Sequence, residues 1–226
     1  MYDFIVVGAR CAGSSVSMLL ARKGYRVLLL DRDSFPSDMP MSTHLVHQRG
    51  VACLSRWGLR DQLLATQSTP INRCDIDFGP FTLSGCPPPV DGESAGFAPR
   101  RILLDDILVR AAAERCAEIR ENHRVDALRF EDKRVVGVSG VSANGGGFTE
   151  RARLVIGADG PSSCVARAIQ AEEYNTKPAL QATAWMYWDG IPMDRVELHQ
   201  RKHEAIYTYP SSNGSTLVGA NWTMDK

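Results

Sequence analysis

The residues from Gly8 to Gly13 have the spacing of a phosphate-binding turn in which one glycine is missing. In a Gly-x-Gly-x-x-Gly turn, the first glycine permits a tight bend, the second lets the backbone approach a pyrophosphate, and the third allows close packing of the following helix. Gly8 and Gly13 take the first and third places, whereas Arg10 stands in the second. The spacing predicts a pyrophosphate site at a helix N-terminus, where backbone N–H groups point at the ligand.

Two interpretations of Arg10 follow from its chemistry. Its guanidinium could fold over the pyrophosphate as a charge-assisted hydrogen-bond donor, or its side chain could point into solvent. Both interpretations leave the backbone N–H groups of the turn intact.

Asp31 is placed to recognise the sugar next to that pyrophosphate. It lies 18 residues beyond Gly13, about where an acid accepts hydrogen bonds from the adenosine ribose hydroxyls. A carboxylate at this position repels a ribose 2′-phosphate, so the sequence disfavours NADP as the nucleotide bound here.

A βαβ unit is needed to bring the turn and the acid together. Apolar runs at 4–7 and 27–30 predict two buried parallel strands. The helix between them can lie close to the sheet because its near turns carry small residues, which are Gly13, Ser14, Ser15 and Ser17.

Further along the chain, 42–66 and 99–116 predict helices, and 71–98 predicts short strands of a separate sheet. The runs AEIRENHRV, DALRFED and RVVGVSGV predict a three-stranded antiparallel meander, where an NAD dehydrogenase would have another crossover helix. The run ARLVIGADG predicts one more buried strand, which ends in a turn at Asp159 and Gly160.

Three motifs in this order carry a resemblance to a known family: VVGARCAGSS with the acid at 31, APRRILLDDILVRAA, and ARLVIGADGPSSCVARA. Together they resemble flavin-dependent monooxygenases of the para-hydroxybenzoate hydroxylase type and their relatives, the geranylgeranyl reductases. The resemblance implies an α/β fold: a Rossmann-like FAD-binding domain of the glutathione-reductase type with a β-meander, plus part of a mainly antiparallel β substrate domain. It also implies FAD as cofactor and NAD(P)H as reductant.

The resemblance assigns FAD contacts to several segments. The turn would hold the pyrophosphate, the acid and its neighbour the adenosine half, Arg101 the flavin-side phosphate or ribityl region, and Val125 the adenine through its backbone. The Asp-Gly pair would help to shape FAD and NAD(P)H binding. The implied residues are Gly8, Ala9, Arg10, Cys11, Ala12, Gly13, Asp31, Arg32, Arg101, Val125, Asp159 and Gly160. No catalytic side chain is implied, because the flavin carries the chemistry.

Three activities fit the resemblance. The first is a monooxygenase in which NAD(P)H reduces the flavin and oxygen is transferred to a small organic substrate. The second is a flavin-dependent prenyl reductase, and the third is a non-catalytic FAD-binding remnant. The aromatic residues Trp185, Tyr187, Trp188, Tyr207 and Tyr209 could line either substrate pocket, although alternating aromatics on a strand are more often core.

The expected division places 1–70 and 99–175 in the FAD-binding domain and 71–98 and 176–226 in a partial substrate sheet. Members of the family continue through a Gly-Asp-Ala motif whose aspartate binds the ribityl chain, and nothing like it occurs in these 226 residues. We interpret the chain as truncated at its C-terminus.

Composition restricts the partners and the compartment. Lys plus Arg and Asp plus Glu each total 26, so no net charge attracts nucleic acid or acidic lipid. No stretch approaches the ~20 apolar residues of a membrane span, and no signal-peptide pattern is present. Six scattered cysteines favour reduced thiols in the cytoplasm. His44 and His47 lack a nearby third ligand, so no metal site is expected. The expected partners are a small-molecule substrate and a second copy of the chain in a homodimer.

Overall fold

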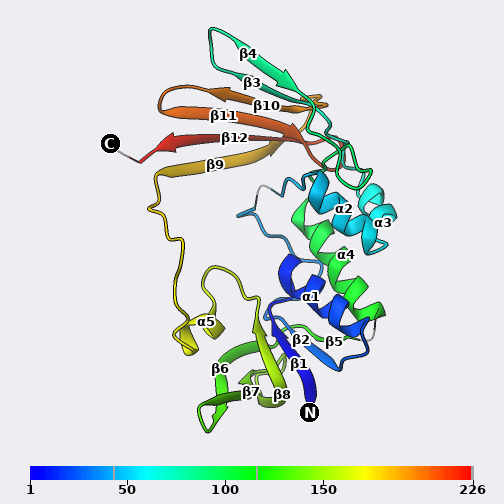
Figure 1. Cartoon of the computed structure of the whole chain (residues 1–226), viewed down its shortest axis with the longest axis vertical. Coiled ribbons are helices and arrows are strands. Elements are labelled where there is room, and N and C mark those ends of the chain that lie inside the picture. Colours follow the sequence, from blue (N-terminus) through cyan, green and yellow to red (C-terminus); the bar gives the residue numbers. More distant parts are fainter. Residues whose placement is uncertain (43, 116, 225–226) are drawn as a thin grey trace. The chain divides into compact units, whose positions relative to one another are not determined.

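The computed structural model describes residues 1–42, 44–115 and 117–224, so the predicted thiol Cys116 lies outside the described residues. The chain separates into two compact units, Met1–Asp38 with Ile102–Tyr174 and Met39–Arg101 with Asn175–Lys226. Each unit contains one six-stranded sheet (Figure 1).

The first unit has the predicted βαβ start. Its strands follow the order β5-β2-β1-β8-β7-β6, and β1 pairs in parallel with both β2 and β8. Its elements are β1 (Tyr2–Val7), α1 (Cys11–Ala21), β2 (Val27–Leu30), α4 (Arg101–Glu114, all but its first residue), β5 (Glu118–Arg120), β6 (Arg124–Glu131), β7 (Arg134–Val141), β8 (Gly147–Gly157) and α5 (Cys164–Ala168).

The meander is present, but two of its strands differ from the prediction. The run AEIRENHRV is divided: β5 extends the parallel sheet beside β2, and β6 begins the antiparallel part. The buried strand predicted at ARLVIGADG is the second half of β8 rather than a separate strand. Because β8 pairs with β7 on one side and with β1 on the other, a single strand joins the meander to the parallel sheet.

Alternation along the parallel strands divides the sheet into two buried faces. Ile5 and Leu28 belong to a core cluster with Val138 of the meander and Val165 of α5. Residues of opposite parity, such as Val6, are also fully buried, and α1 packs against β1 and β2. The first sheet is therefore covered on both faces, as parallel sheets require.

The second unit is built on the expected mainly antiparallel sheet. Its strand order is β4-β3-β10-β11-β12-β9, in which β10 with β3 is the single parallel pair among the described strands. Its elements are α2 (Gln48–Arg56), α3 (Arg60–Ala65), β3 (Cys74–Asp77), β4 (Thr82–Gly85), β9 (Gln181–Trp188), β10 (Val196–Gln200), β11 (Glu204–Pro210) and β12 (Thr216–Thr223).

The aromatic residues of the second sheet divide between its two faces. Tyr209 is 3% exposed in a core cluster with Leu217, and Trp185, Tyr187 and Tyr207 pack against that cluster, as the core interpretation predicts. The side chain of Trp188 is exposed instead.

The structure groups residues 39–70 with the second unit, whereas the expected division placed them in the first. The reason is backbone pairing: Val46 bridges Phe97, Ile71 bridges Gly96, and Ser68 bridges Ser212. These contacts attach both ends of the segment to strand-like stretches of the second unit.

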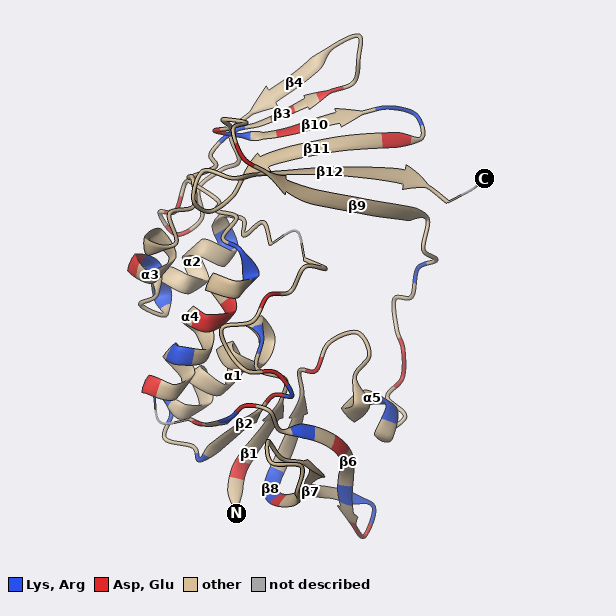
Figure 2. Cartoon of the chain, turned by 180° about the vertical axis from the view of Figure 1, so that it is seen from behind, with Lys and Arg blue, Asp and Glu red and all other residues tan. Residues whose placement is uncertain are grey.

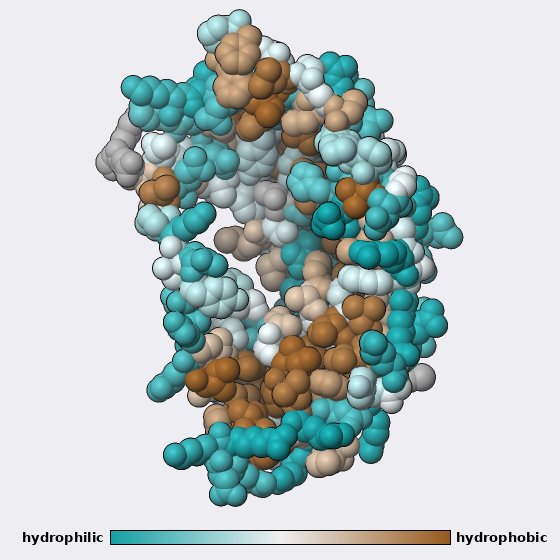
Figure 3. Space-filling view, viewed as in Figure 1, coloured by the Kyte–Doolittle hydropathy of each residue, from teal (hydrophilic) through white to brown (hydrophobic). Residues whose placement is uncertain are grey.

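Basic and acidic residues are mixed along the part of the chain that the structure describes (Figure 2). Figure 2 shows Lys and Arg interspersed with Asp and Glu along the elements of both units. Figure 3 shows apolar residues gathered over the first unit on the face that it displays. Among the helices in the described ranges, none is both long and apolar enough to cross a membrane.

Candidate functional site

The carboxyl ends of three parallel strands meet at one edge of the first sheet. Val7 of β1 is in register with Leu30 of β2 and with Gly157 of β8. The segments that follow these strands therefore start side by side, and they are 8–13, 31–32 and 158–160. Ligands of open α/β sheets bind outside this edge, so the fold brings together three of the predicted groups of site residues.

The turn after β1 packs so closely that glycine is required at two positions. Gly8 has a φ of +97°, and a Cβ on it would lie 2.5 Å from the carbonyl oxygen of Ala158. A Cβ on Gly13 would lie 1.7 Å from the carbonyl oxygen of Gly8. The first hydrogen bond of α1 runs from the Ser14 N–H to the Arg10 carbonyl oxygen at 3.0 Å. The turn thus leads directly into a helix N-terminus, where backbone N–H groups are left without intrahelical acceptors.

Asp31 connects the end of β2 to this turn. It is 7% exposed, and its Oδ2 accepts a 2.6 Å hydrogen bond from the Ala9 N–H. Its Oδ1 accepts a 2.9 Å hydrogen bond from the Asp33 N–H. Each carboxylate oxygen has a second lone pair, so Asp31 can hold the turn and still accept hydrogen bonds from ribose hydroxyls.

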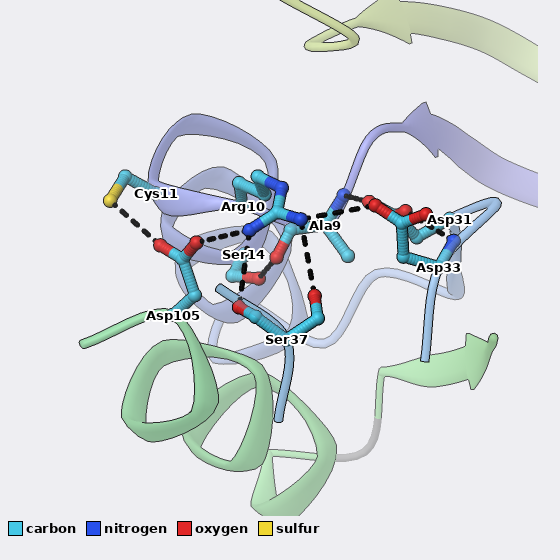
Figure 4. Close-up of polar contacts among 8 residues, drawn as sticks. All are labelled: Ala9, Arg10, Cys11, Ser14, Asp31, Asp33, Ser37 and Asp105. Carbon is cyan, nitrogen blue, oxygen red and sulfur yellow. Dashed lines mark hydrogen bonds and ion pairs between the residues drawn. The ribbon is translucent and has the colours of Figure 1, made fainter. Parts of the chain in front are cut away.

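Arg10 does not point into solvent, so that interpretation is wrong. Its side chain is 16% exposed, and Figure 4 shows its guanidinium between α1, the segment after β2, and α4. Nη1 donates to Asp105 Oδ2 at 2.8 Å, and Nη2 donates to Asp33 Oδ2 at 3.0 Å and to Ser37 Oγ at 3.1 Å. Burial lowers the pKa of Arg10, but the hydrogen bonds to the two carboxylates outweigh burial and raise it above its ordinary value. The guanidinium is therefore directed at carboxylates.

The sequence prediction missed three residues of this network, Asp33, Ser37 and Asp105, of which Asp105 is the most buried. It is fully buried on α4 and also accepts a hydrogen bond from the Cys11 thiol at 3.2 Å. Its signal in the sequence is an acid on the apolar face of a helix, between Leu104 and Leu108. An acid at such a position requires a polar partner on the neighbouring element.

Asp159 accepts hydrogen bonds from the first N–H groups of the short helix α5, whose N-cap residue is Ser163. Its Oδ2 accepts hydrogen bonds from the Cys164 N–H at 2.7 Å and the Val165 N–H at 3.4 Å, and its Oδ1 accepts one from Ser163 Oγ at 2.5 Å. Burial raises the pKa of Asp159, but these hydrogen bonds outweigh burial and hold it below its ordinary value. Burial and the neighbouring carboxylate raise the pKa of Cys164 to about 11. Gly160 follows with a φ of +83°, so the Asp-Gly pair shapes the turn that ends at α5.

Of the remaining predicted residues, Ala12 and Arg32 belong to the segments at this edge, whereas Val125 and Arg101 do not. Ala12 and Arg32 are exposed. Val125 is buried near the start of β6, where its carbonyl oxygen accepts a 3.6 Å hydrogen bond from the Cys164 thiol. Arg101 is the first residue of α4 and is grouped with the second unit.

His44, considered above for metal binding, lies within hydrogen-bond distance of two side chains of the second unit. It is 7% exposed; its Nδ1 lies 3.0 Å from Tyr187 Oη and its Nε2 lies 3.2 Å from Ser211 Oγ. Within residues 1–42, 44–115 and 117–224, no group of three His, Cys, Asp or Glu residues could hold a metal ion.

Comparison with known sequences identifies one family over nearly the whole chain. Residues 1–223 match the profile of the family described as "FAD binding domain". A digeranylgeranylglycerophospholipid reductase of Methanocella arvoryzae is 30% identical over 167 residues, which are 74% of this chain and 41% of that protein. A probable electron transfer flavoprotein-quinone oxidoreductase of Escherichia coli, YgcN, is 29% identical over 89% of this chain and 45% of its own length. The chain thus spans less than half of either relative.

Solved structures of FAD-dependent enzymes share the fold of this chain. The myxobacterial chondrochloren halogenase CndH, a FAD-dependent halogenase, superposes with a TM-score of 0.83 at 22% identity, over 99% of this chain and 53% of that chain. PqsL of Pseudomonas aeruginosa, described as a probable FAD-dependent monooxygenase, superposes with a TM-score of 0.82 at 17% identity, over 98% of this chain and 60% of that chain.

The first test of the site concerns Asp31. Replacing Asp31 with Ala removes a charged acceptor of ribose hydroxyls, a loss of roughly 1.5–3 kcal/mol, so ADP affinity should fall about ten- to a hundredfold. Asp31→Asn is the matched control because its carbonyl oxygen can still accept from the Ala9 N–H, and its affinity should lie between those of the wild type and Asp31→Ala. Isothermal titration with ADP measures both variants. An unchanged affinity in Asp31→Ala would show that the acid contributes to nucleotide binding neither as a ribose acceptor nor through the Ala9 N–H.

The second test concerns the acid at the start of α5. Asp159→Ala should lower the free energy of unfolding at pH 7 by about 1–2 kcal/mol, whereas Asp159→Asn, which keeps an acceptor, should lose less. The folded-state pKa of Asp159 is depressed. The charged carboxylate therefore adds to the free energy of unfolding above the unfolded-state pKa, and this stabilisation is lost as pH falls through the folded-state pKa. Urea unfolding at pH 7 and below pH ~4 should show the wild type and Asp159→Ala converging in acid. A difference that stays constant with pH would contradict stabilisation by the charged carboxylate.

Proposed function

The chain belongs to the FAD binding domain family, and on that basis we propose that it binds FAD and acts as a FAD-dependent oxidoreductase. The observation that carries the proposal is the edge of the first sheet, where the turn 8–13, Asp31 and the start of α1 lie together in a family member. FAD would supply the redox chemistry, and the residues of the chain would bind and orient it.

The described residues fit the adenosine diphosphate half of FAD. A Cβ on Gly8 would clash with the backbone of Ala158, and a Cβ on Gly13 would clash with the carbonyl group of Gly8. The N-terminus of α1 offers backbone N–H groups to the pyrophosphate. Asp31 retains lone pairs for the ribose hydroxyls while it holds the Ala9 N–H. Arg10 would contribute its backbone here, because its guanidinium is occupied by Asp33 and Asp105.

For the reaction, we propose an NAD(P)H-dependent monooxygenase that acts on a small organic substrate. Reduction of a prenyl double bond is the second candidate, because a digeranylgeranylglycerophospholipid reductase is among the sequence relatives. The two candidates are separated by oxygen consumption: a monooxygenase consumes oxygen together with NAD(P)H and substrate, whereas a reductase acts on its substrate without oxygen.

We include homodimer formation in the proposal. Strands β4 and β9 end the second sheet at its two edges, and unpaired strand edges can pair with another chain.

The nucleotide preference tests the proposal directly. FAD should bind more tightly than NAD, ADP should compete with FAD, and FMN should compete poorly because it lacks the adenosine half. Flavin fluorescence during titration with FAD, followed by competition with ADP, FMN and NAD, measures this order. Tighter binding of NAD than of FAD, or failure of ADP to displace FAD, would refute the proposed site.

A further inference from the structure

We propose that Arg10 and Asp105 form a brace that positions the pyrophosphate-binding turn, so that a side chain replaces the middle glycine of the usual turn. The inference deepens the proposed function and rests on nucleotide binding at this turn. It makes Asp105 a positioning residue, since it would act on the ligand through the backbone of residues 8–13.

The backbone at position 10 does not require glycine. Arg10 has a φ of −82° and a ψ of −164°, which lie in the extended region that all L-residues adopt. Its side chain leaves the turn toward α4 and toward the segment after β2, where Asp105, Asp33 and Ser37 receive its donors (Figure 4). The Arg10 side chain is accommodated at this position because the protein supplies hydrogen-bond acceptors for its guanidinium.

The brace fixes both residues at the beginning of α1. Asp105 accepts from the guanidinium of Arg10, the N-cap residue, and from the thiol of Cys11, the first helical residue. Since Asp105 is 0% exposed, its carboxylate cannot exchange these donors freely for water. The start of α1, whose N–H groups would face the pyrophosphate, is thereby tied to α4.

The same guanidinium also sets the spacing between the turn and the acid at 31. Asp33 and Ser37 belong to the segment directly after β2, and both bond to Arg10. Phe35 of that segment lies with its ring centroid 5.7 Å from the guanidinium carbon, within the range of a cation–π contact. One planar, multidentate group thus holds three segments, which a lysine ammonium cannot reproduce.

A brace of this kind predicts a selective effect on ligands that carry a pyrophosphate. Arg10→Gly restores the usual glycine and yet should weaken ADP and FAD binding at least about tenfold, because a buried ion pair is broken. Adenosine, which lacks the pyrophosphate, should lose less than about twofold in affinity. Arg10→Lys keeps a charge without the planar fork and should lie between wild type and Arg10→Gly.

Asp105→Asn and the double variant Arg10→Gly/Asp105→Asn complete a mutant cycle. The loss of ADP affinity caused by Asp105→Asn should be at least about fivefold smaller in the Arg10→Gly background than in the wild type, because the two residues act as one unit. Arg151→Gln, which breaks the exposed ion pair between Arg151 of β8 and Glu131 of β6, is the control and should bind all three ligands as the wild type does.

The experiment is isothermal titration of the full 226-residue chain and its variants with FAD, ADP and adenosine, with circular dichroism and urea unfolding to establish that each variant folds. Arg10→Gly that binds ADP as tightly as the wild type, or that loses ADP and adenosine equally, overturns the inference. Additive effects in the cycle also overturn it. A wild type that binds neither FAD nor ADP refutes the proposed function itself, which is a different outcome from normal binding by Arg10→Gly.

Discussion

The buried ion pair between Arg10 and Asp105 ties the start of helix α1 to α4, and the candidate site is built around that point. Asp105 is fully buried and bonds to the first residues of α1, while Arg10 reaches the segment after β2 through Asp33. The turn that precedes α1 is closed by Gly8 and Gly13, where a Cβ would collide with neighbouring backbone. The hydrogen bonds of Arg10 hold the turn against α4 and the segment after β2. The close backbone contacts at Gly8 and Gly13 hold it against its other neighbours.

The parallel register supplies the remaining geometry. Val7, Leu30 and Gly157 are aligned, so the turn, the acid and the Asp-Gly pair leave the sheet at the same level. Two of the acids there accept hydrogen bonds from backbone N–H groups: Asp31 from Ala9, and Asp159 from Cys164 at the start of α5. These carboxylates organise the edge of the sheet before any nucleotide binds, which reduces the ordering that binding requires.

Much of this could be predicted from local sequence, and the rest depended on contacts between distant residues. The runs 4–7 and 27–30 and glycines 8 and 13 predicted the βαβ unit, because buried strands and tight turns leave local signals. The orientation of Arg10 could not be predicted, since its partner Asp105 is 95 positions away. The division of AEIRENHRV between β5 and β6, and the grouping of 39–70 with the second unit, likewise depend on pairing with other strands.

The central claim is that the turn 8–13 binds a pyrophosphate through its backbone while Arg10 stays with its carboxylates. A crystal structure of the chain with bound ADP tests this most directly. The account predicts phosphate oxygens on N–H groups of the turn and of the first turn of α1, ribose hydroxyls on Asp31, and Arg10 still paired with Asp33 and Asp105. An Arg10 guanidinium that has left Asp105 to bind the phosphates, or ADP bound away from this edge of the sheet, would contradict it.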